Sequence, residues 1–174
     1  EHPDFWLIGP GNDQKTYALS ESQKINEVNN LKGFAIFFNL KKFNKKFFDE
    51  NYFLYFEEID LCKNVKKNNG KIYLDLSIKI FHQGASSVDK INELELEKNR
   101  NWHWMWSTFY YHKKHKGFLL AFINIFPKLL SALFKTIMFS MTLNKNKRDI
   151  YFSRLSGILN SILGNKSWYR PSID

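Results

Sequence analysis

The stretch Phe48-Asp-Glu-Asn-Tyr-Phe-Leu-Tyr-Phe-Glu-Glu-Ile-Asp-Leu-Cys62 does most to decide how this chain folds. It closes with three carboxylates within four residues, at Glu57, Glu58 and Asp60. Acidic side chains favour the first turn of a helix, because they face the positive end of the helix dipole. The stretch therefore predicts that a helix begins at Glu57.

The end of this helix is marked by basic residues and a turn. Lys66 and Lys67 suit a last helical turn, and the Asn-Gly pair that ends at Gly70 is a common stop. The sequence predicts a short helix from Glu57 to Gly70. Three apolar residues share its buried face: Ile59, Cys62 and Val65.

Hydrophobic patterning on both sides of this helix indicates strands. Short apolar runs at 5–10 and 33–38 have the length of buried strands, and the polar stretch 12–30 between them reads as a surface loop. Beyond Gly70, apolar residues alternate at every second position from Ile72 to Ile80, which predicts a strand that packs one face on a core. His82 continues that alternation, and a turn of small residues follows at 84–87.

The carboxylates and His82 allow two interpretations. Neighbouring carboxylates repel one another, which can raise the pKa of one of them toward the value that a general base needs. A neutral imidazole about 22 residues downstream suits a divalent metal. The alternatives are a solvated helix start and an ordinary histidine at a strand end. Spacing alone leaves both interpretations open.

The same stretch resembles a motif of the family 2 glycosyltransferases. In that family Asp-Glu, aromatic residues and Tyr-Phe-Glu-Asp-x-Asp-Leu-Cys precede a helix, a glycine, a hydrophobic strand and a histidine followed by Gly and Ser. The corresponding stretches here are 49–50, 55–62, Gly70 and 82–87. Weaker likenesses at 7–10, 33–36, 157–160, 163–164 and 169–171 extend the resemblance over nearly the whole chain, toward bacterial rhamnosyltransferase-like members.

The resemblance implies the α/β GT-A fold and an inverting transfer of sugar from a nucleoside diphosphate to an acceptor hydroxyl. Glu58 lies where the family has its base, although it is one methylene longer than the usual Asp. Glu57 and Asp60 become supporting catalytic residues, and His82 the residue that approaches the metal or the diphosphate. The substrate-binding residues that the resemblance implies are Gly33, Glu50 and Tyr55.

The family's first half, with its nucleotide-binding strands and Asp-x-Asp metal site, has no counterpart in this sequence. We therefore expect residues 1–87 to be the C-terminal half of a GT-A catalytic domain that is inactive alone. The divalent metal, Mg²⁺ or Mn²⁺, would be bound mostly by the missing half. The expected substrates are a nucleoside-diphosphate sugar and a lipid-linked or glycan acceptor. The alternative is a non-catalytic subunit that anchors a partner or positions an acceptor.

Residues 88–174 carry most of the net positive charge and are expected to form a helical extension. They hold 14 Lys or Arg against 6 Asp or Glu, whereas residues 1–87 hold 12 against 11. Three Trp, one Phe and two Tyr between 102 and 111 adjoin the cluster His112-Lys-Lys-His-Lys116, a combination typical of membrane interfaces. The final stretch forms an amphipathic helix with one apolar face: Leu155, Ile158, Leu159, Ile162 and Leu163.

The stretch 117–143 is apolar enough to meet a membrane. As a helix it would extend ~40 Å, enough to cross a bilayer, but Pro127, Lys128 and Lys135 argue against a simple crossing. We expect helices that lie in the interface, with a buried helical hairpin and a true span as alternatives. Binding of single-stranded nucleic acid is disfavoured, because such a partner would make no use of the long apolar stretch.

The histidines and the cysteine complete the expectations from sequence. His103, His112 and His115 lack acidic or thiol companions and read as interfacial or surface residues rather than metal ligands. The single cysteine, Cys62, cannot form an internal disulfide and reads as a small buried hydrophobe in a reducing compartment. The expected location is the cytoplasm, peripheral to the inner face of the cell membrane.

Overall fold

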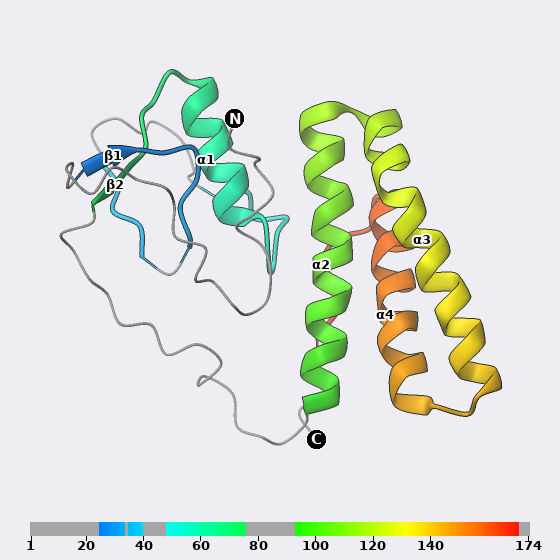
Figure 1. Cartoon of the computed structure of the whole chain (residues 1–174). Coiled ribbons are helices and arrows are strands. Elements are labelled where there is room, and N and C mark those ends of the chain that lie inside the picture. The colour runs from blue at the N-terminus through cyan, green and yellow to red at the C-terminus, as the bar shows by residue number, and fades with distance from the viewer. Residues whose placement is uncertain (1–24, 34, 40–47, 76–92, 171–174) are drawn as a thin grey trace. The chain divides into compact units, whose positions relative to one another are not determined.

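A computed structural model describes residues 25–33, 35–39, 48–75 and 93–170 of the chain (Figure 1). These residues divide into two compact units. The first contains the described residues up to 49 together with 57–75, and the second contains 50–56 and 93–170. The chain therefore contributes the segment 50–56 to the second unit between two stretches of the first.

The first unit is built on helix α1, Glu57–Lys67, and a two-stranded sheet. Strands β1, Ile25–Glu27, and β2, Tyr73–Asp75, pair antiparallel with Asn26 opposite Leu74. The backbone N–H of Val28 donates to the carbonyl of Ile72 at 2.9 Å, which extends the pairing by one bond. The small core comprises Val28, Cys62 and Ile72, flanked by Leu31, Val65 and Leu74.

Helix α1 begins at Glu57, as predicted, and ends at Lys67, three residues before Gly70. Three acidic residues fill its first turn and two lysines its last. After the helix, Asn69 takes a left-handed backbone conformation with φ 58°, and the N–H of Gly70 donates to the carbonyl of Val65 at 2.9 Å. A Cβ added at Gly70 would stand 2.6 Å from Cγ1 of Val65, so the chain needs a glycine where it turns back on the helix.

The strand predictions were right only in part. The alternation from Ile72 onward does begin a strand, β2, whereas 76–80 lie outside the described residues. The strand predicted at 33–38 was wrong for its described part, where no residue is in a strand and Phe37 is 86% exposed. The loop predicted over 12–30 was wrong at 25–27, because Ile25–Glu27 pair with β2. The run at 5–10 lies outside the described residues, as do the other strands expected of a GT-A sheet, so that fold remains a prediction.

The second unit is an up-down-up bundle of three helices (Figure 1). They are α2, Glu93–Lys116, α3, Phe118–Met141, and α4, Lys145–Ile162. All three pack against one another around a core of Met105, Phe109, Ala121, Ile125 and Ile158. The helices expected in 88–174 are therefore present, and they form one bundle.

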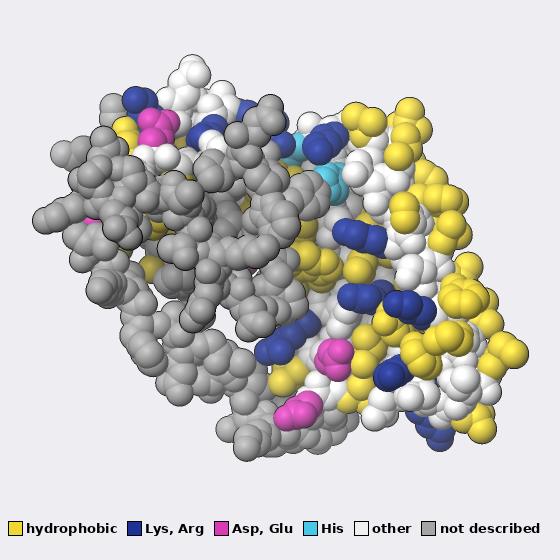
Figure 2. Space-filling model, in the orientation of Figure 1, with side chains coloured by type: hydrophobic (Ala, Val, Ile, Leu, Met, Phe, Trp, Pro, Cys, Tyr) yellow, Lys and Arg dark blue, Asp and Glu magenta, His cyan; other side chains and the backbone are white. Residues whose placement is uncertain are grey.

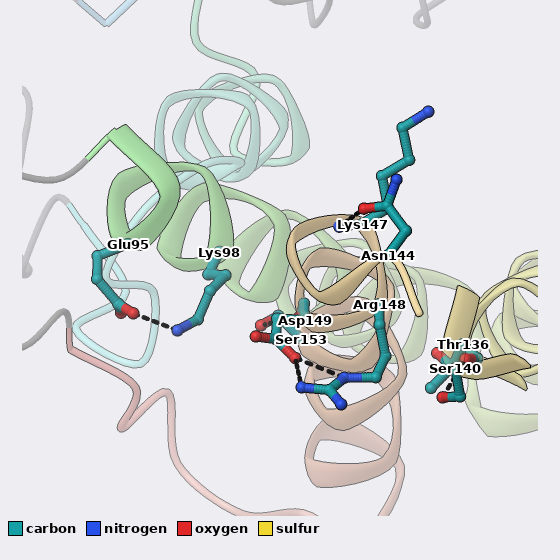
Figure 3. Close-up of polar contacts among 9 residues, drawn as sticks. All are labelled: Glu95, Lys98, Thr136, Ser140, Asn144, Lys147, Arg148, Asp149 and Ser153. Atoms are coloured by element: carbon teal, nitrogen blue, oxygen red, sulfur yellow. Dashed lines mark hydrogen bonds and ion pairs between the residues drawn. The ribbon is translucent and has the colours of Figure 1, made fainter. Parts of the chain in front are cut away.

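The bundle's connections are short. Gly117, with φ 85°, turns the chain between α2 and α3. At the start of α4 the side chain of Asn144 accepts a hydrogen bond from the N–H of Lys147 at 3.2 Å, a standard N-cap (Figure 3). Pro127 lies within α3 without ending it.

Two non-helical segments, 50–56 and 165–170, pack on the side chains of helix α2. The hydroxyl of Ser107 donates to the carbonyl of Leu54 at 2.8 Å. The indole N–H of Trp106 donates to the carbonyl of Asn165 at 3.0 Å. Trp102, Trp106, Phe109 and Tyr111 are buried as a result. The prediction that this aromatic stretch meets a membrane was therefore wrong for these four residues, which form the inside of the bundle.

Candidate active site

The first turn of α1 holds two carboxylates in an unfavourable environment for charge. Burial is the main cause that raises the pKa of Glu57 and of Glu58 above the ordinary carboxyl value, and the negative charge of Glu57 adds to the effect at Glu58. Hydrogen bonds from their own backbone N–H groups oppose the shift at both residues. A carboxylate with a raised pKa holds a proton more tightly, so it is a better base when ionised.

One oxygen of this pair lacks a protein partner. Oε2 of Glu57 is buried and accepts no hydrogen bond from any residue that the structure describes. Buried polar atoms are satisfied in most native structures, so an orphaned carboxylate oxygen calls for an explanation. A substrate hydroxyl would satisfy it.

Gly33 lies against Glu58 within the first unit. A Cβ added at residue 33 would stand 3.5 Å from Cβ and 3.8 Å from Cδ of Glu58. These are ordinary contact distances, so Gly33 packs closely against the side chain of Glu58. Two residues that the sequence placed in one site, the base and the acceptor-side glycine, are neighbours here.

Asp60 occupies a different environment. It is 1% exposed, and its Oδ2 accepts a hydrogen bond from Nδ2 of Asn64 at 3.0 Å, one turn along the same helix. This carboxylate is enclosed by the protein and engaged in α1. Its position favours a role in holding the first turn over direct contact with a substrate.

The two residues directly before Glu57 have strained backbones. Tyr55 and Phe56 both take left-handed conformations, with φ 68° and 72°. A single residue in this region costs an aromatic side chain about 1 kcal/mol or more, so packing must compensate. Trp104 supplies it: its ring lies 5.2 Å from that of Tyr55 and 5.4 Å from that of Phe56, while Tyr111 lies 5.2 Å from Phe56.

Strain of this kind is common at functional sites, and here it lies in the segment 50–56 of the second unit. Sequence reasoning missed it. The run of aromatic residues before Glu57 was a signal of packing, but nothing in residue type indicated left-handed backbone at two successive positions.

The remaining predicted residues divide between the units. Tyr55 and the exposed Glu50 belong to the second unit, whereas Gly33, Glu57 and Glu58 belong to the first. His82 lies outside the described residues. Within the part of the chain that the structure describes, no three His, Cys, Asp or Glu side chains gather as a metal site. The described residues alone do not fit a divalent cation.

Two of the three histidines of α2 are buried, so the prediction of surface or interfacial residues was wrong for them. His103 is fully buried and His112 is 5% exposed. Nε2 of His103 donates to the carbonyl of Tyr169 at 2.8 Å, and Nδ1 accepts from the hydroxyl of Ser167 at 2.8 Å. Burial, followed by the charge of Arg170, lowers the pKa of His103 to about 4 against the opposing effect of the Tyr169 carbonyl. His103 is thus a neutral residue that fastens the C-terminal segment to α2.

Cys62 is a buried thiol, as the sequence predicts. It is 3% exposed and packs in the core of the first unit. Burial is the main cause that raises the pKa of its thiol, so it is a poor nucleophile at neutral pH. Cys62 therefore contributes packing and no chemistry.

Comparisons with known proteins found no match for this chain. No protein-family profile matches it, and neither a curated protein nor a solved structure does. The motif around Glu58 and the environment of Glu57 and Glu58 in the first turn of α1 are therefore the features that indicate a function.

Proposed function

We propose that this chain supplies the base and acceptor side of an inverting glycosyltransferase that works at a membrane surface. The observation that carries the proposal is the pair Glu57 and Glu58, two partly buried carboxylates with raised pKa in the first turn of one helix. The motif from residue 49 to residue 62 supports it independently, through its resemblance to family 2 glycosyltransferases.

The proposed step is an in-line displacement. The Glu58 carboxylate takes the proton of the acceptor hydroxyl while that oxygen forms a bond to the anomeric carbon of the sugar. The bond from the anomeric carbon to the diphosphate oxygen breaks, and the nucleoside diphosphate leaves with the electron pair. Glu57 accepts a hydrogen bond from the acceptor through Oε2, which has no partner among the described residues.

The nucleotide and any Mg²⁺ or Mn²⁺ are assigned to a nucleotide-binding half that residues 1–174 do not contain. The acceptor class is a lipid-linked or glycan hydroxyl. A lipid-linked acceptor fits best, because the second unit presents a long apolar helix to solvent. Donor sugar and linkage belong to the nucleotide-binding half.

The test is sugar-nucleotide turnover with lipid-linked acceptors by residues 1–174 joined to their nucleotide-binding half. Glu58→Gln keeps size and removes the base, and should lower turnover by roughly 10²- to 10⁴-fold. Glu27→Gln is the matched control, because Glu27 is a half-exposed carboxylate of the same unit, 3.8 Å from Lys71. Equal turnover by Glu58→Gln and Glu27→Gln would remove Glu58 from the mechanism.

A second function is favoured by a separate observation. The exposed apolar surface of α3 would equally suit a non-catalytic subunit that anchors a partner or positions an acceptor at a membrane. That reading predicts no turnover with any donor, together with full membrane binding by Glu58→Gln.

A further inference from the structure

The outer surface of α3 is apolar along its whole length and uncovered within the described part of the chain. Side chains there recur at helical spacing and are between 43% and 70% exposed: Leu119, Ile123, Phe126, Leu130, Phe134 and Ile137. The side that faces α2 and α4 holds the buried Ala121, Ile125 and Ala132. Figure 2 shows hydrophobic side chains gathered over α3. Soluble proteins rarely expose an apolar strip of this length to solvent.

The two charges within α3 do not interrupt this strip. Lys135 directs its ammonium toward α4, where Nζ lies 4.9 Å from the ring centre of Tyr151 and donates to its hydroxyl at 3.3 Å. Lys128 lies seven residues earlier, on the same side of the helix, near Arg154 of α4. The lysines that argued from sequence against a simple crossing of the membrane therefore lie on the bundle side of α3.

Three polar side chains of α3 donate hydrogen bonds within the helix. Asn124 donates to the carbonyl of Leu120 at 2.7 Å, Thr136 to that of Ala132 at 2.7 Å, and Ser140 to that of Thr136 at 2.8 Å (Figure 3). A donor that already has an acceptor costs less to remove from water. The helix can therefore enter an apolar phase without leaving these groups unpaired.

Basic residues stand at both ends of the strip. Lys113 and Lys116 end α2 just before Gly117, and Lys145 and Lys147 begin α4 just after α3. Nζ of Lys113 lies 6.0 Å from the ring centre of Phe118, and Nζ of Lys147 lies 5.4 Å from that of Phe139. An apolar strip between two cationic ends complements a surface that offers hydrocarbon below and anionic headgroups around it.

The packing of α4 against α3 indicates whether α3 lies in the plane of a membrane or crosses it. Helix α3 is the one helix among the described residues that is long and apolar enough to cross a membrane. Yet α4 packs along it and carries Arg148, Asp149 and Arg154. Arg148 and Asp149 pair at 2.8 Å, but neither is buried (Figure 3). An upright α3 would draw these charges into hydrocarbon, which is strongly unfavourable.

We propose that α3 lies in the plane of an anionic membrane, with its outer strip in the hydrocarbon of one leaflet and the bundle's basic ends among the headgroups. This inference does not depend on glycosyl transfer. A chain that binds membranes and transfers no sugar would retain it and overturn the function proposed above.

The test is flotation of the full chain with vesicles of phosphatidylcholine, with and without phosphatidylserine. We expect binding that is tighter with phosphatidylserine and at least about tenfold weaker for Ile123→Asp. Ile25→Asp is the matched control, because Ile25 is 57% and Ile123 58% exposed, on different units. Near-UV circular dichroism establishes that both variants fold.

Orientation is measured with single labels at residues 119 and 137, quenched by lipids brominated at known depths. A helix in the plane places both labels at one depth, whereas a crossing helix separates them. Absence of vesicle binding, equal binding by Ile123→Asp, two different depths, or self-association through Ile123 without vesicle binding would each overturn the proposal.

Discussion

Gly157 of α4 lies directly against the backbone of Trp102 in α2. A Cβ added at residue 157 would stand 2.4 Å from the carbonyl oxygen of Trp102 and 3.1 Å from its carbonyl carbon. Because the obstacle is helical backbone, the two helices would have to move apart. We expect Gly157→Ala to lower the free energy of unfolding by about 1–3 kcal/mol, despite the better helix propensity of alanine. Urea unfolding measures the change, with the exposed Asn146→Ala as a control expected within ~0.5 kcal/mol. A stabilised Gly157→Ala variant would contradict the close approach.

His103 should make the bundle sensitive to acid. Its pKa is about 4 in the folded chain, against an ordinary 6.5 once unfolded. The unfolded state therefore takes up a proton first as the pH falls from 6.5, and stability declines until the pH nears 4. The loss attributable to this residue approaches roughly 3 kcal/mol. The difference in unfolding free energy between wild type and His103→Gln, followed from pH 7.5 to 4.5, isolates it. Parallel pH profiles for the two proteins would show that His103 does not titrate as described.

Glu58 should reduce the stability of the helix that carries it. Burial raises its pKa, so the folded state holds the proton more tightly than the unfolded state does. Stability is then lost as the pH rises from 4.5 through the raised value, and the ionised form is unfavourable at pH 7. Glu58→Gln should therefore slow hydrogen exchange of α1 amides at pH 7, with a smaller gain near pH 4. Faster exchange in the variant at pH 7 would mean that the carboxylate stabilises the helix, and would count against a poised base.

Glu57 should set the pH at which the proposed base becomes active. Its negative charge adds to the raised pKa of Glu58, after burial. Glu57→Gln removes that charge, so the pKa of Glu58 should fall and the acidic limb of kcat/KM should move to lower pH. Maximal turnover should also drop, since the proposed hydrogen bond to the acceptor weakens. A limb that stays in place would indicate that another group titrates.

The sequence predicted correctly those features of the fold that depend on neighbouring residues. The boundaries and buried face of α1 followed from its acidic first turn, its lysines and Gly70, because helix ends are determined by nearby residues. The helices from 93 onward followed from length and apolar content. The sequence did not predict which strands pair when they lie far apart along the chain. Strand β1 needed knowledge of its partner β2, and the run at 33–38 had strand composition but pairs with no described strand.

The candidate site shows the same division. The sequence showed the chemical groups of the candidate site, which are two adjacent carboxylates that follow a run of aromatic residues. The partial burial of Glu57 and Glu58 and the contact of Gly33 with Glu58 depend on tertiary packing. The aromatic residues of α2 misled for that reason: Trp102 and Trp106 suit a membrane interface and a bundle core equally well, and only the packing segments 50–56 and 165–170 decide between them.

The placement of 50–56 within the bundle means that no single cut separates the two units. A polypeptide that started at residue 88 would lack the carbonyl of Leu54 for Ser107, the ring of Tyr52 for Tyr110 and the side chain of Asn51 for its hydroxyl. Its bared aromatic surface would favour misassembly. A continuous polypeptide that keeps these contacts must therefore begin at or before residue 50, and so it must also contain helix α1.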